Sequence, residues 1–392
     1  MPNMRLADRM SRLGSEGAFA ASARARALEA TGRSVIHLEI GEPDFATPAN
    51  IVEAAKRALD DGWTHYPPAA GLPELRAAIA ADSTARRGVA VSPRQALVMP
   101  GAKPAIFYAI LALAQEGDEV IYPDPGFPTY ESMTRFVGAT PVPMPHRQEN
   151  NFGLDPDELA GLVTSRTRMI ILNSPANPTG GVLSRADLQR IADTAIEHDL
   201  VVLADEIYGR ILYGGEHISI SSLPGMAERT IVLDGFSKAY AMTGWRMGYA
   251  IVPEPLAEPF ERLLINSVSG TSAHQQIAAV EALTGPQDAV EAMIAEFRVR
   301  RNLIVDGLNA IDGVRCLLPD GAFYVFPDVS GTGLTGAQAA DRLLAEAGVS
   351  VLSGSAFGNV GANHLRISYA NSRERIAAAL ERMRSVFEPV RV

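Results

Sequence analysis

One lysine in this sequence has a setting that favours nucleophilic chemistry. Lys238 lies in the segment Gly-Phe-Ser-Lys-Ala-Tyr, residues 235–240, between two apolar runs that have the character of buried strands. In an open α/β sheet the carboxyl ends of the strands border the ligand crevice, and a lysine there can lose its hydration. Desolvation lowers the pKa of a lysine and makes its amine nucleophilic. Taken alone, however, the segment is more simply explained as an exposed loop.

Polar residues also follow the two preceding strands of the chain. Asn177 lies in Asn-Pro-Thr-Gly after the apolar run 169–172, and Asp205 and Tyr208 lie in Asp-Glu-Ile-Tyr after the run 201–204. Each has an ordinary explanation, as turn chemistry or as a helix cap. Three consecutive strands, however, deliver these side chains and Lys238 to one edge of a sheet, and this conjunction indicates a ligand site.

The elements that must position these residues form an α/β pattern. Apolar runs at 96–99, 119–122, 169–172, 201–204, 230–233 and 247–251 alternate with helical segments such as 102–114 and 185–198. This alternation predicts a mostly parallel sheet with crossover helices, and uninterrupted apolar strands predict that helices cover both faces.

A change of pattern after Pro253 predicts a second, smaller domain. A helical stretch over 255–310 precedes short strands near 322–326 and 349–352, and a last helix begins at Ser372. The early run 35–40 fits either unit. A chain of 392 residues is long enough for two or three packed units, at about 100–200 residues each.

Composition excludes several classes of function. A formal charge of −10 with dispersed Lys and Arg offers no basic surface for nucleic acid. A single cysteine, Cys316, excludes an intrachain disulfide and fits a cytoplasmic protein. No run reaches the ~20 apolar residues of a membrane span, no targeting segment is evident, and the seven histidines show no metal-ligand spacing.

With these motifs the sequence resembles the class I/II aminotransferases of pyridoxal 5'-phosphate (PLP) fold type I, and most closely the bacterial aspartate aminotransferase branch. The resemblance extends from Gly-Glu-Pro-Asp-Phe at 41–45 to Leu-Arg-Ile-Ser-Tyr at 365–369. It implies a large PLP-binding domain over 46–284 with a mostly parallel seven-stranded sheet, and a small α+β domain formed by 1–45 and 285–392. It also implies a cytoplasmic homodimer with shared active sites.

The resemblance assigns roles around the cofactor ring. Asp205 matches the acid that keeps the pyridine nitrogen protonated, so that the ring can draw electrons from a substrate carbanion. Asn177 and Tyr208 match the residues that hydrogen-bond the phenolate oxygen. Lys238 matches the lysine that holds PLP as a Schiff base, is displaced by the substrate amine, and then moves the proton.

The cofactor phosphate calls for a helix N-terminus and cationic or hydroxyl side chains. The backbone amides that match this role belong to Gly101, Ala102 and Lys103. Ser237 and Arg246 match the phosphate-binding side chains of the family. Tyr66 resembles the tyrosine that reaches the phosphate from the neighbouring subunit, which implies a dimer.

Substrate recognition follows from the same resemblance. Arg366 matches the arginine that holds the substrate α-carboxylate by two hydrogen bonds, and Gly41 allows the backbone to approach the same group. Asn177 also borders this position. Phe127 replaces the tryptophan that usually stacks on the pyridine ring in aspartate aminotransferases, and this weakens the case for aspartate.

The side chain of the substrate is less well defined. Lys103 matches the lysine that binds a distal carboxylate in the bacterial aspartate branch. Against a dicarboxylate, Glu16 and Ala18 replace the Ser and Thr of that branch. The predicted reaction is ping-pong transfer of an amino group from aspartate, glutamate or an aromatic amino acid to 2-oxoglutarate. An aminotransferase for neutral amino acids is one alternative, and another PLP carbanion reaction, such as a lyase or a decarboxylase, is a second.

Two other interpretations have less support. Gly-Thr-Gly-Leu-Thr-Gly at 331–336 fits the dinucleotide pattern, but the following strand region 349–354 ends in no acidic residue, so we interpret it as a flexible loop. A regulator that senses PLP through an aminotransferase-like domain carries an added DNA-binding domain, and the motifs here begin near residue 41.

Overall fold

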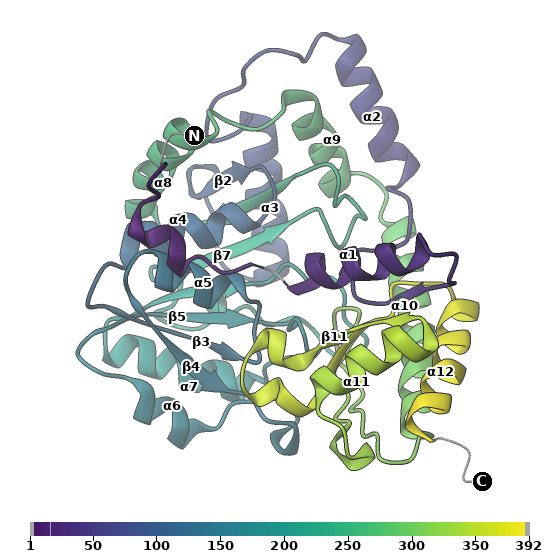
Figure 1. Cartoon of the computed structure of the whole chain (residues 1–392). Helices are drawn as coiled ribbons and strands as arrows, with labels where there is room; N and C mark the ends of the chain where they lie inside the picture. Colours follow the sequence, from purple (N-terminus) through teal and green to yellow (C-terminus); the bar gives the residue numbers. More distant parts are fainter. Residues whose placement is uncertain (1–3, 16, 389–392) are drawn as a thin grey trace.

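The computed structural model describes residues 4–15 and 17–388. Its centre is a seven-stranded sheet (Figure 1). The strands are β2 (Ala96–Met99), β3 (Glu119–Asp124), β4 (Thr140–Pro145), β5 (Thr167–Asn173), β6 (Val201–Asp205), β7 (Thr230–Gly235) and β8 (Gly248–Ile251). Their spatial order is β2-β8-β7-β6-β5-β3-β4. Strand β8 pairs antiparallel with β2 and β7, and every other neighbouring pair is parallel. The predicted α/β class is confirmed.

The sequence located six of these strands and missed β4. This strand contains three prolines in Thr-Pro-Val-Pro-Met-Pro, and proline removes a backbone donor from a sheet ladder. Strand β4 lies at an edge of the sheet, where it pairs on one side with β3. An edge position tolerates prolines that a central strand would not.

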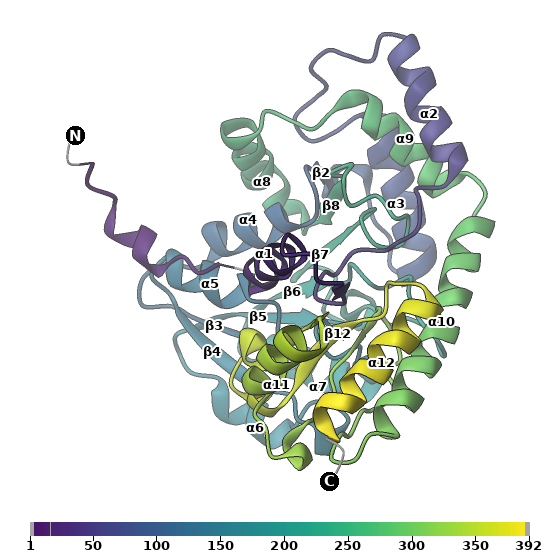
Figure 2. The same ribbon diagram turned by 45° about the vertical axis from the view of Figure 1, so that its right-hand side comes forward.

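Helices cover both faces of the sheet. Successive side chains of a strand point to opposite faces, so uninterrupted apolar strands need cover on both. One face packs against α4 (Lys103–Leu113), α5 (Thr129–Phe136) and α8 (Glu254–Ser267) through residues such as Leu203. The other packs against α3 (Pro73–Arg87), α7 (Arg185–Glu197) and α9 (Ala273–Thr284) through residues such as Val202 and Val232. In Figure 2, α4 and α8 lie on the left of the sheet and α3 and α9 on the right. Helix α2 (Ala49–Asp60) packs on α9, and α6 (Pro156–Leu162) contacts α7.

The carboxy-terminal part forms a second core. Its elements are α10 (Asp288–Asn309), β9 (Tyr324–Val325), α11 (Gly336–Arg342), the π-helical turn η6 (Leu343–Ala347), β10 (Val349–Ser350), β11 (Leu352–Ser353), β12 (Leu365–Ser368) and α12 (Arg373–Phe387). Strands β11, β12 and β9 form an antiparallel sheet in that order. The predicted helical stretch 255–310 is three helices, because Ser269 and Gly270 adopt positive φ between α8 and α9 and Gly285 follows α9.

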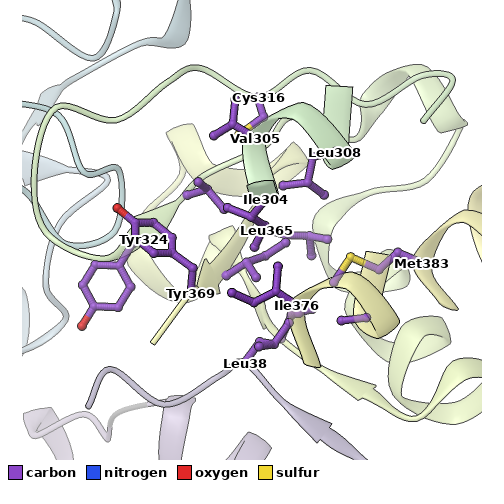
Figure 3. Close-up of a cluster of buried hydrophobic side chains, with 14 of the residues drawn as sticks. Leu38, Ile304, Val305, Leu308, Cys316, Tyr324, Leu365, Tyr369, Ile376 and Met383 are labelled. Atoms are coloured by element: carbon purple, nitrogen blue, oxygen red, sulfur yellow. The ribbon is translucent and has the colours of Figure 1, made fainter. Parts of the chain in front are cut away.

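The early run 35–40 belongs with this second core. Strand β1 (Ile36–His37) pairs parallel with β10. Figure 3 shows Leu38 in the same buried cluster as Leu365 and Ile376. The chain therefore contributes its amino-terminal segment to the carboxy-terminal unit.

The remaining elements are short or lie at the amino terminus. Helix α1 (Gly17–Glu29) follows the 3-10 turn η1 (Asp8–Arg12), which packs against α5. The other 3-10 turns are η2 (Pro93–Gln95), η3 (Gln148–Asn150), η4 (Ile220–Ser222), η5 (Ser330–Thr332), η7 (Gly354–Phe357) and η8 (Val360–Asn363). The glycine-rich segment 331–336 spans η5 and the start of α11, and a Cβ at Gly331 would meet the backbone of Gly313 at 2.7 Å. Close backbone packing explains that glycine without a bound dinucleotide.

Candidate active site

The carboxyl ends of β2, β5, β6 and β7 border a cavity of about 480 Å³. Residues from α1, the 40–41 segment and the second core complete its wall. All the residues that the sequence assigned to the site line this cavity except Gly101 and Tyr66. The cavity is therefore the place where the predicted groups meet.

Lys238 lies in the turn that follows β7. Its Nζ donates a hydrogen bond to the carbonyl oxygen of Gly41 at 2.6 Å. Burial lowers the pKa of Lys238 to about 8, and the nearby cation of Arg366 adds to this effect against the carboxylate of Glu42. A larger share of the amine is therefore uncharged near neutral pH, as a nucleophile requires.

Asp205 ends β6 with its carboxylate at the cavity. Its Oδ2 accepts a hydrogen bond from the hydroxyl of Tyr130 at 2.7 Å, and its Oδ1 accepts one from the amide of Ile207 at 3.2 Å. Burial raises the pKa of Asp205 to about 6, and the carboxylates of Asp234 and Glu206 act in the same direction. A cationic group in the cavity would offset this penalty.

Tyr130 is a functional contact that the sequence analysis did not assign. It is the second residue of α5, three positions after Phe127, and the centroids of their edge-to-face rings lie 5.8 Å apart. The signal available was its spacing from Phe127, three residues apart at the start of a helix.

Arg366 enters the cavity from β12. Its Nη1 donates to the side-chain oxygen of Asn177 at 3.4 Å, and its Nη2 donates to the backbone carbonyl of Glu39. The guanidinium lies over the rings of Tyr324 and Phe357, 4.8 and 5.1 Å from their centroids. This stacking fixes the plane of the fork.

Tyr324 was missed by the sequence analysis, and it explains the glycine at position 41. Its hydroxyl pairs with that of Tyr208 at 2.8 Å, and a Cβ on Gly41 would overlap this hydroxyl. The backbone at Gly41 therefore approaches both Tyr324 and Lys238. Its predicted contact with a substrate carboxylate stays a prediction.

A second polar region lies where β2 meets α4. Gly101 has a φ of +87°, and a Cβ there would overlap Nη2 of Arg246. Gly101 thus lies behind the arginine rather than on the cavity wall. Ala102 precedes α4 and Lys103 is its first residue, so their backbone amides lie at the N-terminus of the helix, and Ser237 lines the same cavity.

The comparisons with known proteins agree with this geometry. The family model for aminotransferase class I and II matches residues 33–383. An aspartate aminotransferase of Pyrococcus abyssi is 44% identical over 358 residues, which cover 90% of this chain and 92% of that protein. An aromatic-amino-acid aminotransferase of Thermococcus litoralis is 42% identical over the same length, with the same coverage of both chains. The structure of the Thermus thermophilus aspartate aminotransferase with maleate superposes with a TM-score of 0.94 at 39% identity, over 98% of this chain and 100% of that one.

The chain belongs to the class I and II aminotransferases.

The cavity of this aminotransferase fits the family cofactor, PLP. The N-terminus of α4, Arg246 and Ser237 line this one cavity, and they are the kinds of group that bind a phosphate; only a glycine at 101 leaves room for that arginine. The desolvated amine of Lys238 and the buried carboxyl of Asp205 face the same cavity. An aldehyde with a basic ring nitrogen matches this pair of groups.

Apolar side chains form much of the wall near Lys103. Its Nζ lies 5.1 Å from the ring centroid of Phe127. Phe19 and Ile106 line the same cavity, as does Ala18. Glu16, which the sequence analysis contrasted with the aspartate branch, lies outside the described residues.

Tyr66 lies away from the cavity of its own chain and is 94% exposed. Its predicted reach into a neighbouring subunit stays a prediction. Among residues 4–15 and 17–388 the aminotransferase has no helix that is long and apolar enough to cross a membrane, and no cluster of three or more metal-binding side chains.

Proposed function

We propose that this aminotransferase moves an amino group from aspartate, glutamate or an aromatic L-amino acid to 2-oxoglutarate by a ping-pong mechanism. The observation that carries the proposal is that the Lys238 amine, the Asp205 carboxyl and the Arg366 guanidinium line one cavity. Relatives named for aspartate and for aromatic amino acids support these donor classes.

PLP, when bound, supplies an electron-accepting ring that stabilises the carbanion left by removal of the α-proton. We propose that Asp205 holds the ring nitrogen, and that Asn177 and Tyr208 hold the phenolate oxygen. The phosphate is held by Ser237, Arg246 and the amides of Gly101, Ala102 and Lys103, with Tyr66 contributed by a second subunit. Phe127 is proposed to stack on the ring.

Lys238 is proposed to move the substrate proton. Its pKa, lowered to about 8, lies close to neutral pH, which suits a base that accepts a proton and then returns it. The 2.6 Å bond to the Gly41 carbonyl orients Nζ at the cavity wall. The Tyr130 hydroxyl donates a hydrogen bond to the Asp205 carboxylate and so holds that second reactive group of the cavity in place.

Arg366 is proposed to bind the α-carboxylate of both substrates. A planar fork accepts the carboxylate of an amino acid and that of a 2-oxo acid with the same geometry. One binding site for both substrates means that the first product leaves before the acceptor enters. This order is the ping-pong scheme.

The donor side chain is proposed to lie near Lys103. This cation supports a dicarboxylic donor, and the maleate complex of the Thermus relative is in keeping with one. Phe19, Ile106 and Phe127 supply an apolar wall that supports an aromatic or neutral donor.

We also propose that the chain divides into a large domain, residues 46–284, and a small domain formed by residues 1–45 and 285–392. The pairing of β1 with β10 supports this division.

A panel of donors and acceptors tests the proposal. With PLP and one donor alone, the enzyme is expected to release one equivalent of 2-oxo acid per active site. Turnover is expected to resume only when a 2-oxo acid acceptor is added. Release of carbon dioxide or ammonia in place of the 2-oxo acid would favour a decarboxylase or a lyase instead.

A further inference from the structure

A group of buried and partly buried charged residues lies on the face of the sheet opposite the cavity, behind Asp205. Along β6 and β7, Asp205 and Leu233 line the cavity, whereas the next residues, Glu206 and Asp234, point to the other face, where α3 packs. We name this group the rear charge cluster. Its members are Asp82, Arg86, Arg87, Glu206, Arg210, His217 and Asp234.

Arg87 contacts two carboxylates in this cluster. Its Nε donates to Glu206 Oε2 at 2.7 Å, and its Nη2 donates to Asp234 Oδ2 at 2.7 Å. Its side chain is 1% exposed. Arg86 pairs with Asp234, at 2.6 Å, and with Asp82 rather than with Glu206.

The cluster is coupled to the site through the chain itself. Glu206 follows Asp205, and its carbonyl accepts the amide of Gly209 at 2.7 Å, closing the turn that presents Tyr208 to the cavity. The side chain of Glu206 also accepts a hydrogen bond from Ser219 at 2.5 Å. Anchoring Glu206 at the rear therefore fixes two neighbouring groups at the front.

The cluster is also coupled to the site through charge. Burial would raise the pKa of Glu206, but Arg87 and His217 lower it below its usual value. Burial acts in the same way on Asp234, whose pKa Arg86 and Arg87 lower. Both carboxylates are therefore ionised next to Asp205, whose ionisation they oppose. Pairing with Arg86 and Arg87 reduces that repulsion.

Stability alone is a poor explanation of this arrangement. Burying an ion pair costs desolvation that the attraction often does not recover, so apolar residues of similar volume are commonly as stable. A role in the site accounts for charges that packing does not require.

We propose that Arg87 is a positioning residue for Asp205: its pairing with Glu206 and Asp234 cancels the negative charge behind the sheet and anchors the turn that carries Asp205 and Tyr208. This inference rests on the proposed role of Asp205 in holding the cofactor ring nitrogen. The ionisable groups that act directly on Asp205 are Tyr130 from α5, Tyr208 from its own turn, Asp234 from β7 and Glu206. Asp234 and Glu206 are in turn surrounded by further ionisable groups, which are Asp82, Arg86, Arg87, Arg210, His217 and Tyr249.

The test measures the titration of Asp205 in the full-length protein without cofactor. Aspartate labelled with ¹³C at the carboxyl carbon is followed by NMR against pH, and the Asp205 signal is identified by its loss in Asp205→Asn. In Arg87→Met we expect the midpoint to rise by at least one pH unit, a tenfold weaker ionisation, because two carboxylates lose their shared partner. An unchanged midpoint in a folded Arg87→Met protein would overturn the proposal.

Two further variants give matched comparisons. Arg86→Met removes a neighbouring arginine that does not pair with Glu206, and is expected to move the midpoint less than half as far; an equal shift would overturn the special role of Arg87. Glu206→Gln removes a negative charge beside Asp205 and is expected to lower the midpoint, so it decides the question if Arg87→Met does not fold. An unchanged midpoint there also overturns the proposal. Retained transamination in Asp205→Asn would instead contradict the proposed function, independently of these titrations.

Discussion

Asp205 and Glu206 are adjacent in sequence, equally buried and chemically alike, yet their surroundings shift them in opposite directions. Burial raises the pKa of Asp205 to about 6, because its neighbours are one tyrosine hydroxyl, one amide and two further carboxylates. The pKa of Glu206 lies below its usual value, because Arg87 and His217 outweigh the effect of burial. The rear carboxylate is neutralised within the chain, and the front carboxylate is left for a ligand to neutralise.

The two faces of the sheet also differ in the partners of their charged side chains. On the rear face, arginines and acids pair with one another at 2.6 to 2.7 Å. On the cavity face, Lys238 and Asp205 come from adjacent strands and make their hydrogen bonds to a carbonyl, a hydroxyl and an amide rather than to an opposite charge. A ligand with complementary groups supplies what is missing there.

Removing the amine from the cavity face is expected to have the largest effect. Lys238→Ala removes both the group that holds the cofactor and the base that moves the proton, so turnover should fall by at least about a thousandfold. The formation of 2-oxo acid measures the loss. Lys56→Ala, at an exposed lysine that pairs with Glu53, is the matched control and should keep full turnover. Substantial turnover in Lys238→Ala would contradict the assignment.

Neutralising Asp205 and neutralising Glu206 should affect kcat and stability in opposite ways. Asp205→Asn is expected to lower kcat by about a hundredfold or more, because the ring nitrogen loses its partner, whereas Glu206→Gln should lower kcat much less. Stability should change in the reverse sense. A raised folded pKa means that Asp205 costs stability as pH rises above its unfolded value near 4, up to about 2–3 kcal/mol above pH 6.

Thermal unfolding of the cofactor-free protein at pH 7 checks these signs. Asp205→Asn is expected to be more stable than the wild type. Glu206→Gln is expected to be less stable by about 3–5 kcal/mol, because it leaves Arg87 without its partner. In the wild type, folding lowers the pKa of Glu206, so this carboxylate stabilises the folded protein above pH ~4, and that stabilisation is lost as pH falls. Equal destabilisation by both substitutions would contradict the contrast between the two faces.

The carboxylate clamp should show a smaller and more general effect. Arg366→Ala removes a charge-assisted fork worth about 1.5–3 kcal/mol, so KM should rise about tenfold to a hundredfold. The rise should be similar for every donor and acceptor, since all carry the α-carboxylate. Initial rates over a substrate panel measure it. A loss confined to one donor would assign Arg366 to the side chain instead.

The smallest effect is expected at Lys103. Lys103→Ala should lower kcat/KM for aspartate and glutamate by about tenfold, and for phenylalanine or tyrosine by much less, since only the former carry a distal carboxylate. Paired measurements on the same preparation separate the two cases. Equal losses would exclude Lys103 as a specificity residue and leave it a role at the cofactor phosphate.

The sequence predicted the central strands and the loops at their ends because buried parallel strands are uninterrupted apolar runs. Strand β4 was missed because its prolines fit only an edge. The run 35–40 was recognised, but it carries too short a signal to assign β1 to either unit. Its pairing with β10, more than 300 positions along the chain, is a tertiary contact that no local pattern encodes.

Within the site, the motif residues were predictable and their supports were not. Lys238, Asp205 and Asn177 follow strands, so their meeting at one sheet edge follows from topology. Tyr130 and Tyr324 are buried aromatic residues whose hydroxyls reach the site only through tertiary packing. Arg87 lies at the end of a helix with the composition of an exposed surface, and only the structure shows it buried beneath the sheet.

The most direct test uses the fact that the chain contains three lysines, at positions 56, 103 and 238. The enzyme is reconstituted with PLP, the imine is fixed with borohydride, and the digested peptides are weighed by mass spectrometry. We expect one phosphopyridoxyl group per chain, on the peptide that contains Lys238. A group on Lys103 or Lys56 in its place, or no retained group, would contradict it.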